Sequence, residues 1–311
     1  MAWFAWRSRN AKNGKATAYA GTADNYAQRR MRWLGGRRHM EDAPYLLPTD
    51  DQEINRLDFQ HYMLRFLLRG NYAAPISAPA SILDVGSGTG RWCTEMATLF
   101  PRANVIGTDV VAPATDRPDG AAPAVEGGAR PTNYAFVPGD VLGRLPFDDG
   151  LFDFVHMRLL LFAIPAPRWP DVVAELVRVT RPGGWIELVE TGPQQGGGQA
   201  MEQLVQWISA AMAYRGVDPL IGPTVGSFLS AAGVPRVKYR PIGVEVGKRG
   251  GRVGAMAETD IFAVMNGVKA PLVQAGITSE PAFQHAIQAA RADINRVPCT
   301  LPFYVFWGQK V

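Results

Sequence analysis

Cysteine and long hydrophobic runs are scarce in this sequence of 311 residues, and each absence excludes a class of protein. The two cysteines, Cys93 and Cys299, stand far apart and form no CxxC pair, so neither a disulfide framework nor a zinc site is expected. No stretch reaches the roughly 18 consecutive apolar residues that a membrane-spanning helix needs. Residues 1–15 also lack the apolar core of a signal peptide. We therefore expect a cytoplasmic protein in a reducing compartment.

The charge distribution leaves several partners open. Charged residues make up 19% of the chain and hydrophobic residues 47%, a balance typical of a folded globular protein. The net charge is +4, and residues 1–40 are strongly basic, with Asp24 as their one acidic residue. Such an arm binds nucleic acid in some proteins, remains solvated in others, or packs on a second copy of the chain. No aromatic-basic repeat favours nucleic acid, and a homo-oligomer built through the arm stays open.

Strand-like and helix-like segments alternate through the middle of the chain. Short apolar runs predict buried strands, and apolar residues three or four positions apart predict helices. The strands are expected at 81–86, 104–110, 134–140, 152–157 and 185–190, and the helices between them at 91–100 and 169–180. This alternation predicts an α/β protein with a mostly parallel sheet and helices on both faces.

The flanking regions are predicted to be largely helical. Helices are expected at 25–34 and 50–70 before the sheet, and at 201–214, 222–232, 255–275 and 280–296 after it. Strand-like stretches are expected at 236–247, between the second and third of these later helices, and at 302–311 after the last one. Within the core region, a loop rich in Ala, Pro and Gly occupies 112–131. We divide the chain into a basic arm and helical lid (1–75), a sheet core (76–195), and cover helices with closing strands of the same sheet (196–311).

A glycine-rich turn follows the first predicted strand of the core. Gly86, Gly88 and Gly90 alternate with other residues, and glycine lets the backbone adopt unusual angles and approach a ligand closely. Because Arg91 and Trp92 follow Gly90, the turn is not a P-loop, which ends in Gly-Lys-Ser/Thr. Nor is it the dinucleotide fingerprint GxGxxG, whose third glycine would stand one position later.

Two further strands end in an aspartate. Asp109 closes the second strand and Asp140 the third, at the edge of a parallel sheet where ligands bind. The Asp109 carboxylate is suited to accept hydrogen bonds from two ribose hydroxyls, and Asp140 from an adenine amino group, with Val141 packing on the ring. Either aspartate alone is equally well explained as a helix cap. Their order around a glycine turn favours a site for an adenosine-containing cofactor.

These motifs together carry a resemblance to a known family. The segments LDVGSGTG (83–90), GTDV (107–110), GDV (139–141), FDFVHMR (152–158) and RPGGWIELVE (181–190) resemble the ordered motifs of class I S-adenosylmethionine-dependent methyltransferases. Residues 45–61, YLLPTDDQEINRLDFQH, resemble the branch known from fungal secondary-metabolism regulators and bacterial natural-product tailoring enzymes. The resemblance implies a Rossmann-like sheet, mostly parallel with an antiparallel closing strand, that binds S-adenosyl-L-methionine.

The resemblance also implies roles for individual residues. It places the methionine part of the cofactor among Asp84, Gly86, Ser87 and Gly88. It places the ribose and adenine at Asp109 and Val110, the adenine at Asp140 and Val141, and it implies an amino-terminal lid carrying Tyr26. No metal is expected, because the four histidines show no ligand pairing such as HxxxH. The Asn/Asp-Pro-Pro-Tyr/Phe tetrapeptide of many amino-group methyltransferases that act on nucleobases or glutamine is absent.

Methyl transfer requires the acceptor to be aligned with the activated methyl group, and in some cases to lose a proton. His61 and His156 are the candidate bases, and each is equally well explained as a structural histidine. Arg158 is a candidate for orienting a polar or anionic substrate, or for a salt bridge within the fold. The hypothesis is transfer to a small-molecule, secondary-metabolite acceptor beneath the cover helices. The alternatives are a nucleic-acid methyltransferase and a cofactor-binding regulatory protein with little turnover.

Overall fold

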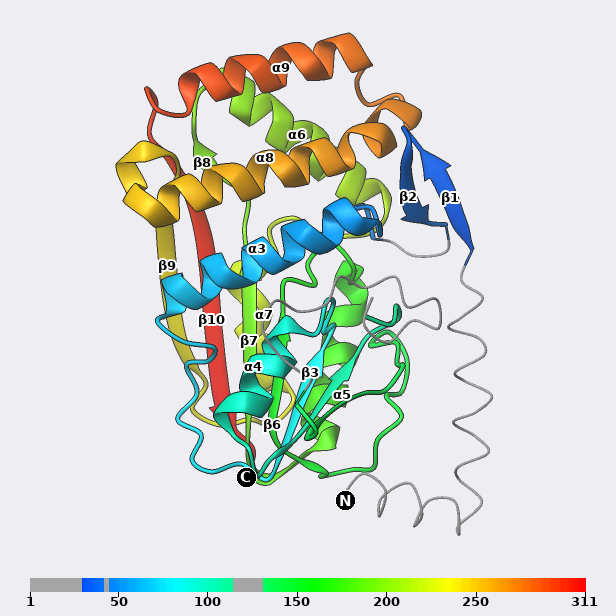
Figure 1. The fold of residues 1–311 in the computed structure, drawn as a ribbon, viewed down its shortest axis with the longest axis vertical. Coiled ribbons are helices and arrows are strands. Elements are labelled where there is room, and N and C mark those ends of the chain that lie inside the picture. Colours follow the sequence, from blue (N-terminus) through cyan, green and yellow to red (C-terminus); the bar gives the residue numbers. More distant parts are fainter. Residues whose placement is uncertain (1–29, 42–44, 114–130) are drawn as a thin grey trace.

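The computed structural model describes residues 30–41, 45–113 and 131–311, and its centre is one mixed β-sheet (Figure 1). Along the sheet the strands follow the order β5-β4-β3-β6-β7-β10-β8, and β9 pairs with β10. The pairs among β3, β4, β5, β6 and β7 are all parallel. The predicted α/β class with a mostly parallel sheet is confirmed.

The parallel strands agree with the sequence-based prediction. They span Ser81–Val85 (β3), Asn104–Thr108 (β4), Tyr134–Phe136 (β5), Phe152–Arg158 (β6) and Thr180–Thr191 (β7). Helices α4 (Arg91–Leu99) and α5 (Trp169–Val179) cover the sheet. Helix α5 buries residues three and four positions apart, Trp169, Val172, Val173, Leu176 and Val179, which is the apolar stripe by which a helix packs on a sheet.

Antiparallel strands from the carboxyl-terminal third close the sheet. Strand β10 (Cys299–Gln309) pairs antiparallel with β7 and with β9 (Lys238–Glu245). The short β8 (Gln195–Gly196), which the sequence did not predict, pairs with the start of β10. The antiparallel closing strand is therefore confirmed, while the division of the chain at residues 75 and 195 stays a prediction.

A layer of helices stands over one end of the sheet. It contains α3 (Asp51–Leu68), α6 (Gln199–Tyr214), α8 (Gly251–Gln274) and α9 (Glu280–Asp293), while the short α7 (Val225–Ala231) packs beside α5. In Figure 1 this layer lies above the strands, and β10 descends from it to the carboxyl terminus. Because β10 runs opposite to the parallel strands, the layer covers their carboxyl ends. That edge is where ligands bind in parallel sheets.

A β-hairpin stands where the sequence predicted a helix at 25–34. Strand β1 (Met31–Leu34) pairs antiparallel with β2 (Arg37–Met40), and residues 25–29 lie outside the described residues. Gly35 and Gly36 form the turn with φ angles of 56° and 75°. Two consecutive positive φ angles suit a tight hairpin turn and are incompatible with a helix. The helix prediction is therefore wrong over Met31–Leu34.

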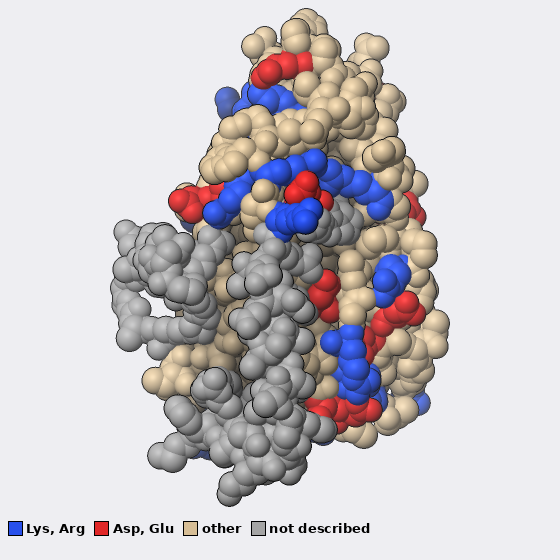
Figure 2. All heavy atoms as spheres, turned by 90° about the vertical axis from the view of Figure 1, so that its right-hand side faces the viewer, with Lys and Arg blue, Asp and Glu red and all other residues tan. Residues whose placement is uncertain are grey.

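The hairpin brings basic side chains to the face seen in Figure 2. Lys and Arg gather there at the level of the hairpin, which carries Arg32, Arg37 and Arg38. Arg37 forms two hydrogen bonds with the Asp50 carboxylate, of 2.6 and 2.8 Å, and Arg38 donates to the Thr49 carbonyl. Two of these cations therefore tie the hairpin to the segment that begins α3. Within the described ranges, no helix has the length and apolar character needed to cross a membrane.

Candidate cofactor and acceptor site

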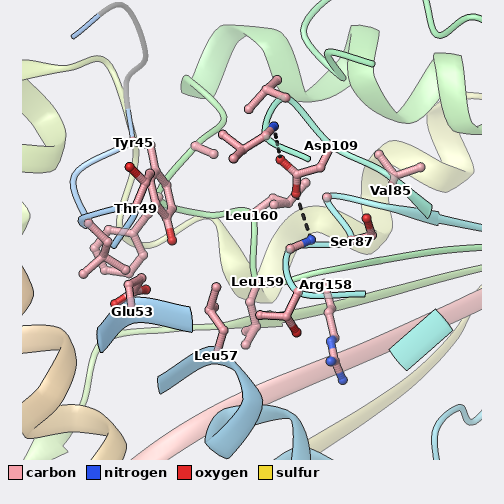
Figure 3. A pocket seen from close by; sticks show the side chains of 18 of the residues that line it. Tyr45, Thr49, Glu53, Leu57, Val85, Ser87, Asp109, Arg158, Leu159 and Leu160 are labelled. Atoms are coloured by element: carbon pink, nitrogen blue, oxygen red, sulfur yellow. Dashed lines mark hydrogen bonds between the residues drawn. The ribbon is translucent and has the colours of Figure 1, made fainter. Parts of the chain in front are cut away.

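A pocket of about 370 Å³ lies between the carboxyl ends of the parallel strands and the helical layer. Its floor comes from the loops after β3, β4, β5 and β6, and its roof from the segment before α3, from α3 itself and from Val264 of α8. Figure 3 shows Asp109 and Ser87 on one side of this space, with Tyr45, Thr49 and Glu53 facing them. The topology therefore builds one cavity from residues that are distant in the chain.

The glycine turn after β3 forms a tight part of the floor. Gly86 and Gly88 have φ angles of 71° and 54°, which residues with a side chain rarely adopt. A Cβ at Gly86 would lie 2.6 Å from the Leu160 side chain, so the turn approaches the loop after β6 closely. The Ser87 hydroxyl is buried and has no hydrogen-bond partner among the described residues. The turn thus offers the pocket a close backbone and an unsatisfied hydroxyl.

Asp109 follows β4 and presents its carboxylate beside the glycine turn. Its Oδ2 accepts from the Gly88 N–H at 2.9 Å, and its Oδ1 accepts from the Val111 N–H at 3.1 Å (Figure 3). Burial raises the pKa of Asp109, while these backbone donors oppose the rise. The backbone bonds orient the carboxylate at the wall of the pocket, where it can still accept from a ligand.

The adenine-side residues predicted from the sequence also line the pocket. Val110 follows Asp109, and Asp140 and Val141 follow β5. The Asp140 Oδ1 accepts from the Leu142 N–H at 2.9 Å, which orients this carboxylate as well. The structure thus brings all the predicted cofactor-binding residues to one cavity: Asp84, Gly86, Ser87, Gly88, Asp109, Val110, Asp140 and Val141.

His156 lies under the pocket rather than in it. Its ring is buried, stacks on Trp92 at 4.1 Å between centroids, and places Nδ1 at 2.8 Å from the Asp84 Oδ1. The Cys93 thiol lies 3.5 Å from the other oxygen of Asp84. His156 is not among the residues that line the pocket. These contacts give it a role in holding Asp84, and its role as a base stays a prediction.

His61 is likewise buried and absent from the pocket wall. Its Nδ1 lies 2.9 Å from the Arg158 Nη2, and its Nε2 lies 3.3 Å from the Glu95 carboxylate. Burial, with a further contribution from Arg158, lowers the pKa of His61. Arg158 itself does line the pocket. The histidine therefore connects α3 to β6 and α4, and its catalytic role also remains untested.

A buried ionic network on α3 also borders the pocket, and the sequence analysis missed it. Arg56 donates to the Glu53 carboxylate at 2.7 Å and to the Asp260 carboxylate of α8 at 2.8 Å, and Gln60 also donates to Asp260. Glu53, Arg56 and Gln60 are three and four positions apart, so they share one face of α3. That spacing was visible in the sequence, whereas the partner Asp260 was not.

Glu190 at the end of β7 also lines the pocket, although its place on the predicted fifth strand suggested a structural residue. It is fully buried, its Oε1 accepts from the Leu160 N–H at 2.8 Å, and its Oε2 has no partner among the described residues. Burial raises the pKa of Glu190 to about 8. Glu187 on the same strand lies outside the pocket and accepts from the Ala73 and Ala74 N–H groups. Tyr26 lies outside the described residues.

The pocket has unsatisfied groups that fit S-adenosyl-L-methionine. Ser87 Oγ and Thr108 Oγ1 are buried without partners in the described part of the chain, and both residues line the pocket. Asp109 supplies an oriented carboxylate for hydroxyl donors, and glycine at position 86 lets the turn lie against Leu160, where a Cβ would clash. A ligand with hydroxyl groups, an amino acid end and a flat ring complements this set.

Comparison with known proteins supports the same cofactor. Residues 82–184 match the family model described as a methyltransferase domain. The N-methyltransferase sirN of Leptosphaeria maculans is 26% identical over 284 residues, which cover 87% of this chain and 96% of that protein. The secondary metabolism regulator LAE1 of Cochliobolus heterostrophus is 30% identical over 166 residues, 51% of this chain and 48% of that protein.

Among solved structures, a phosphoethanolamine N-methyltransferase 2 of Haemonchus contortus in complex with S-adenosyl-L-methionine has a TM-score of 0.48. It is 15% identical, and the match covers 82% of this chain and 52% of that one. The sheet order, the glycine turn and the matched domain all indicate a methyltransferase. Residues 82–184 thus carry a methyltransferase domain, and the chain resembles the class I S-adenosylmethionine-dependent methyltransferases of the secondary-metabolism branch.

Proposed function

We propose that this enzyme transfers the methyl group of S-adenosyl-L-methionine to a nucleophilic atom of a small secondary metabolite. The observation that carries the proposal is a pocket that joins the predicted cofactor residues to an apolar region under α3 and α8. Leu47, Ile54, Leu57 and Val264 supply that apolar wall. Apolar walls with a few placed polar groups are typical of small-molecule sites. Because the relative sirN is named an N-methyltransferase, nitrogen acceptors are the first choice for screening.

In this proposal the residues around the glycine turn hold the cofactor. Asp109 accepts from the ribose hydroxyls with Val110 beside it, Asp140 and Val141 hold the adenine, and Asp84, Ser87 and the turn glycines surround the methionine part. When bound, S-adenosyl-L-methionine supplies an activated methyl group. The chain's task is then to align the acceptor and exclude water, and good alignment contributes roughly 7–11 kcal/mol to lowering the barrier. The helical layer over the strand ends provides this enclosure.

Calorimetric titration with S-adenosyl-L-methionine and S-adenosylhomocysteine tests the cofactor site. We expect Asp109→Ala to weaken binding of both by about 10- to 100-fold, because a charged acceptor of two hydroxyl hydrogen bonds is lost. Asp109→Asn should lose less affinity than Asp109→Ala, since its amide oxygen still accepts a hydrogen bond from a ribose hydroxyl.

The matched control is Asp171→Ala on the exposed surface of α5, a residue that does not line the pocket. We expect this variant to bind like the wild type. Folded wild-type protein that binds neither compound would contradict the proposal. Equal binding by wild type and Asp109→Ala would remove Asp109 from the site.

A further inference from the structure

The Arg158 side chain is a half-buried cation without a carboxylate partner in the described part of the chain. Its Nη2 bonds to the His61 ring, and no described carboxylate lies within 4 Å of the guanidinium. Arg56, the other arginine that lines the pocket, contacts both Glu53 and Asp260. A cation removed from water is costly unless an anion or strong acceptors surround it. Arg158 therefore forms no ion pair of the kind that its counterpart has, and the carboxylates of Asp84 and Glu95 act on it only from farther away.

His61 holds Arg158 without neutralising it. A guanidinium only donates hydrogen bonds, so the His61 Nδ1 that faces it must accept, and the ring is the neutral tautomer protonated on Nε2. That Nε2 lies 3.3 Å from Glu95, which Arg65 and Asn71 also contact. His61 thus fixes the direction of the guanidinium but brings it no negative charge.

The remaining nitrogens of Arg158 are available to a ligand. Among the described residues, His61 is the hydrogen-bond partner of Arg158, through Nη2. The other guanidinium nitrogens are not among the buried atoms that lack a partner, so they are accessible, and the residue lines the pocket. In Figure 3 the Arg158 guanidinium lies on the opposite side of Ser87 from Asp109. The sheet order β5-β4-β3-β6 gives the same sequence of positions: Asp140, Asp109, the glycine turn and then Arg158. A ligand whose ribose lies at Asp109 therefore extends across the glycine turn toward Arg158.

We propose that Arg158 binds the carboxylate of the methionine moiety of the cofactor, with neutral His61 as the residue that positions it. This inference rests on the proposed function, because it assumes that the cofactor occupies the pocket. A guanidinium matches a carboxylate with two parallel hydrogen bonds. The assignment replaces a substrate-orienting role for Arg158 and a proton-transfer role for His61 with two linked roles in cofactor binding.

The test compares two ligands that differ at the methionine end. S-adenosylhomocysteine has the carboxylate, whereas 5′-methylthioadenosine has the same adenosine and thioether without the amino acid group. Their dissociation constants are measured by calorimetry for the full chain and for Arg158→Met. We expect Arg158→Met to weaken S-adenosylhomocysteine by about 30-fold or more and 5′-methylthioadenosine by less than about threefold.

Two further variants separate charge from fold. Arg158→Lys keeps the charge but not the paired geometry, so it should lose part of the S-adenosylhomocysteine affinity and none for 5′-methylthioadenosine. Arg65→Met is the matched control, because Arg65 contacts the Glu95 carboxylate that lies beside His61 but has a side chain that is 51% exposed. This control should bind both ligands as the wild type does. Thermal unfolding of each variant confirms that it is folded.

Each other outcome is decisive. Equal weakening of both ligands by Arg158→Met and Arg158→Lys would overturn the inference and make Arg158 a structural residue. Unchanged binding of both ligands would overturn the inference as well, and Arg158 would then be a candidate for binding the methyl acceptor. Wild-type protein that binds neither ligand would instead refute the proposed function, so the two failures are distinguishable.

Discussion

Replacing Arg56 with methionine should lower the free energy of unfolding by about 3–5 kcal/mol. The side chain lies between the carboxylates of Glu53 and Asp260, and all three residues are buried. Burial lowers the pKa of Arg56, but the two carboxylates outweigh this effect and hold it above its ordinary value. Methionine would leave two buried carboxylates facing each other without a cation. Urea denaturation at constant m-value measures the loss.

Two comparison variants show whether the loss of stability comes from leaving buried carboxylates unpaired or from the loss of one positive charge on α3. Arg65→Met removes an exposed arginine from the same helix and should cost less than about 1 kcal/mol. Neutralising the carboxylates as well, in Glu53→Gln/Arg56→Met/Asp260→Asn, should restore much of the stability, because no unpaired charge remains. A loss below about 1 kcal/mol for Arg56→Met itself would show that water or rearrangement satisfies the two carboxylates.

The second large effect concerns Glu190, whose carboxyl should make the protein less stable as the pH rises. Burial raises the pKa of Glu190 to about 8 from its ordinary value of 4.5. Between these two pH values the folded protein holds a proton that the unfolded chain has released. Stability is therefore complete below about pH 4.5 and is lost progressively up to about pH 8. The upper limit of this loss is about 5 kcal/mol.

Glu190→Gln should remove this pH dependence, because the amide keeps an acceptor for the Leu160 N–H but carries no charge. The two proteins should be similarly stable at about pH 5, and the variant more stable by several kcal/mol at about pH 9. Glu245→Gln, at an exposed position of β9, serves as the control and should follow the wild type. Parallel stability curves for wild type and Glu190→Gln would show that the carboxyl is solvated or paired.

These two residues also bear on the pocket, because Arg56 and Glu190 both line it. The carboxylates of Glu53 and Asp260 share the cation of Arg56, and burial tends to keep the Glu190 carboxyl protonated, so most of the charge on the acceptor side is paired or neutral. A ligand that enters this region therefore meets mainly apolar surface and hydrogen-bonding groups. This is consistent with the largely apolar small-molecule acceptor that we propose.

Much of the fold follows from local patterns. The five core strands and α5 lie where apolar periodicity placed them, because burial of one face or stripe is encoded by residues close in sequence. The hairpin at 31–40 was not predicted, although Gly35 and Gly36 are a hairpin signal, because the preceding residues 25–34 carry a helical pattern. The glycine turn and the aspartates at the strand ends were also predictable, because parallel topology brings strand ends together.

The sequence by itself thus determined the class of fold, the cofactor and the residues after each strand that line the pocket. Only the tertiary structure decided which polar side chains meet across it. Arg56 bonds to Asp260 across 204 positions, and Arg158 contacts His61 across 97. Periodicity says which face of an element is buried but not which distant group packs against that face. The contacts of α3 with β6 and α4 bury His61, the contacts with Trp92 and Asp84 bury His156, and Arg158 remains in the pocket wall.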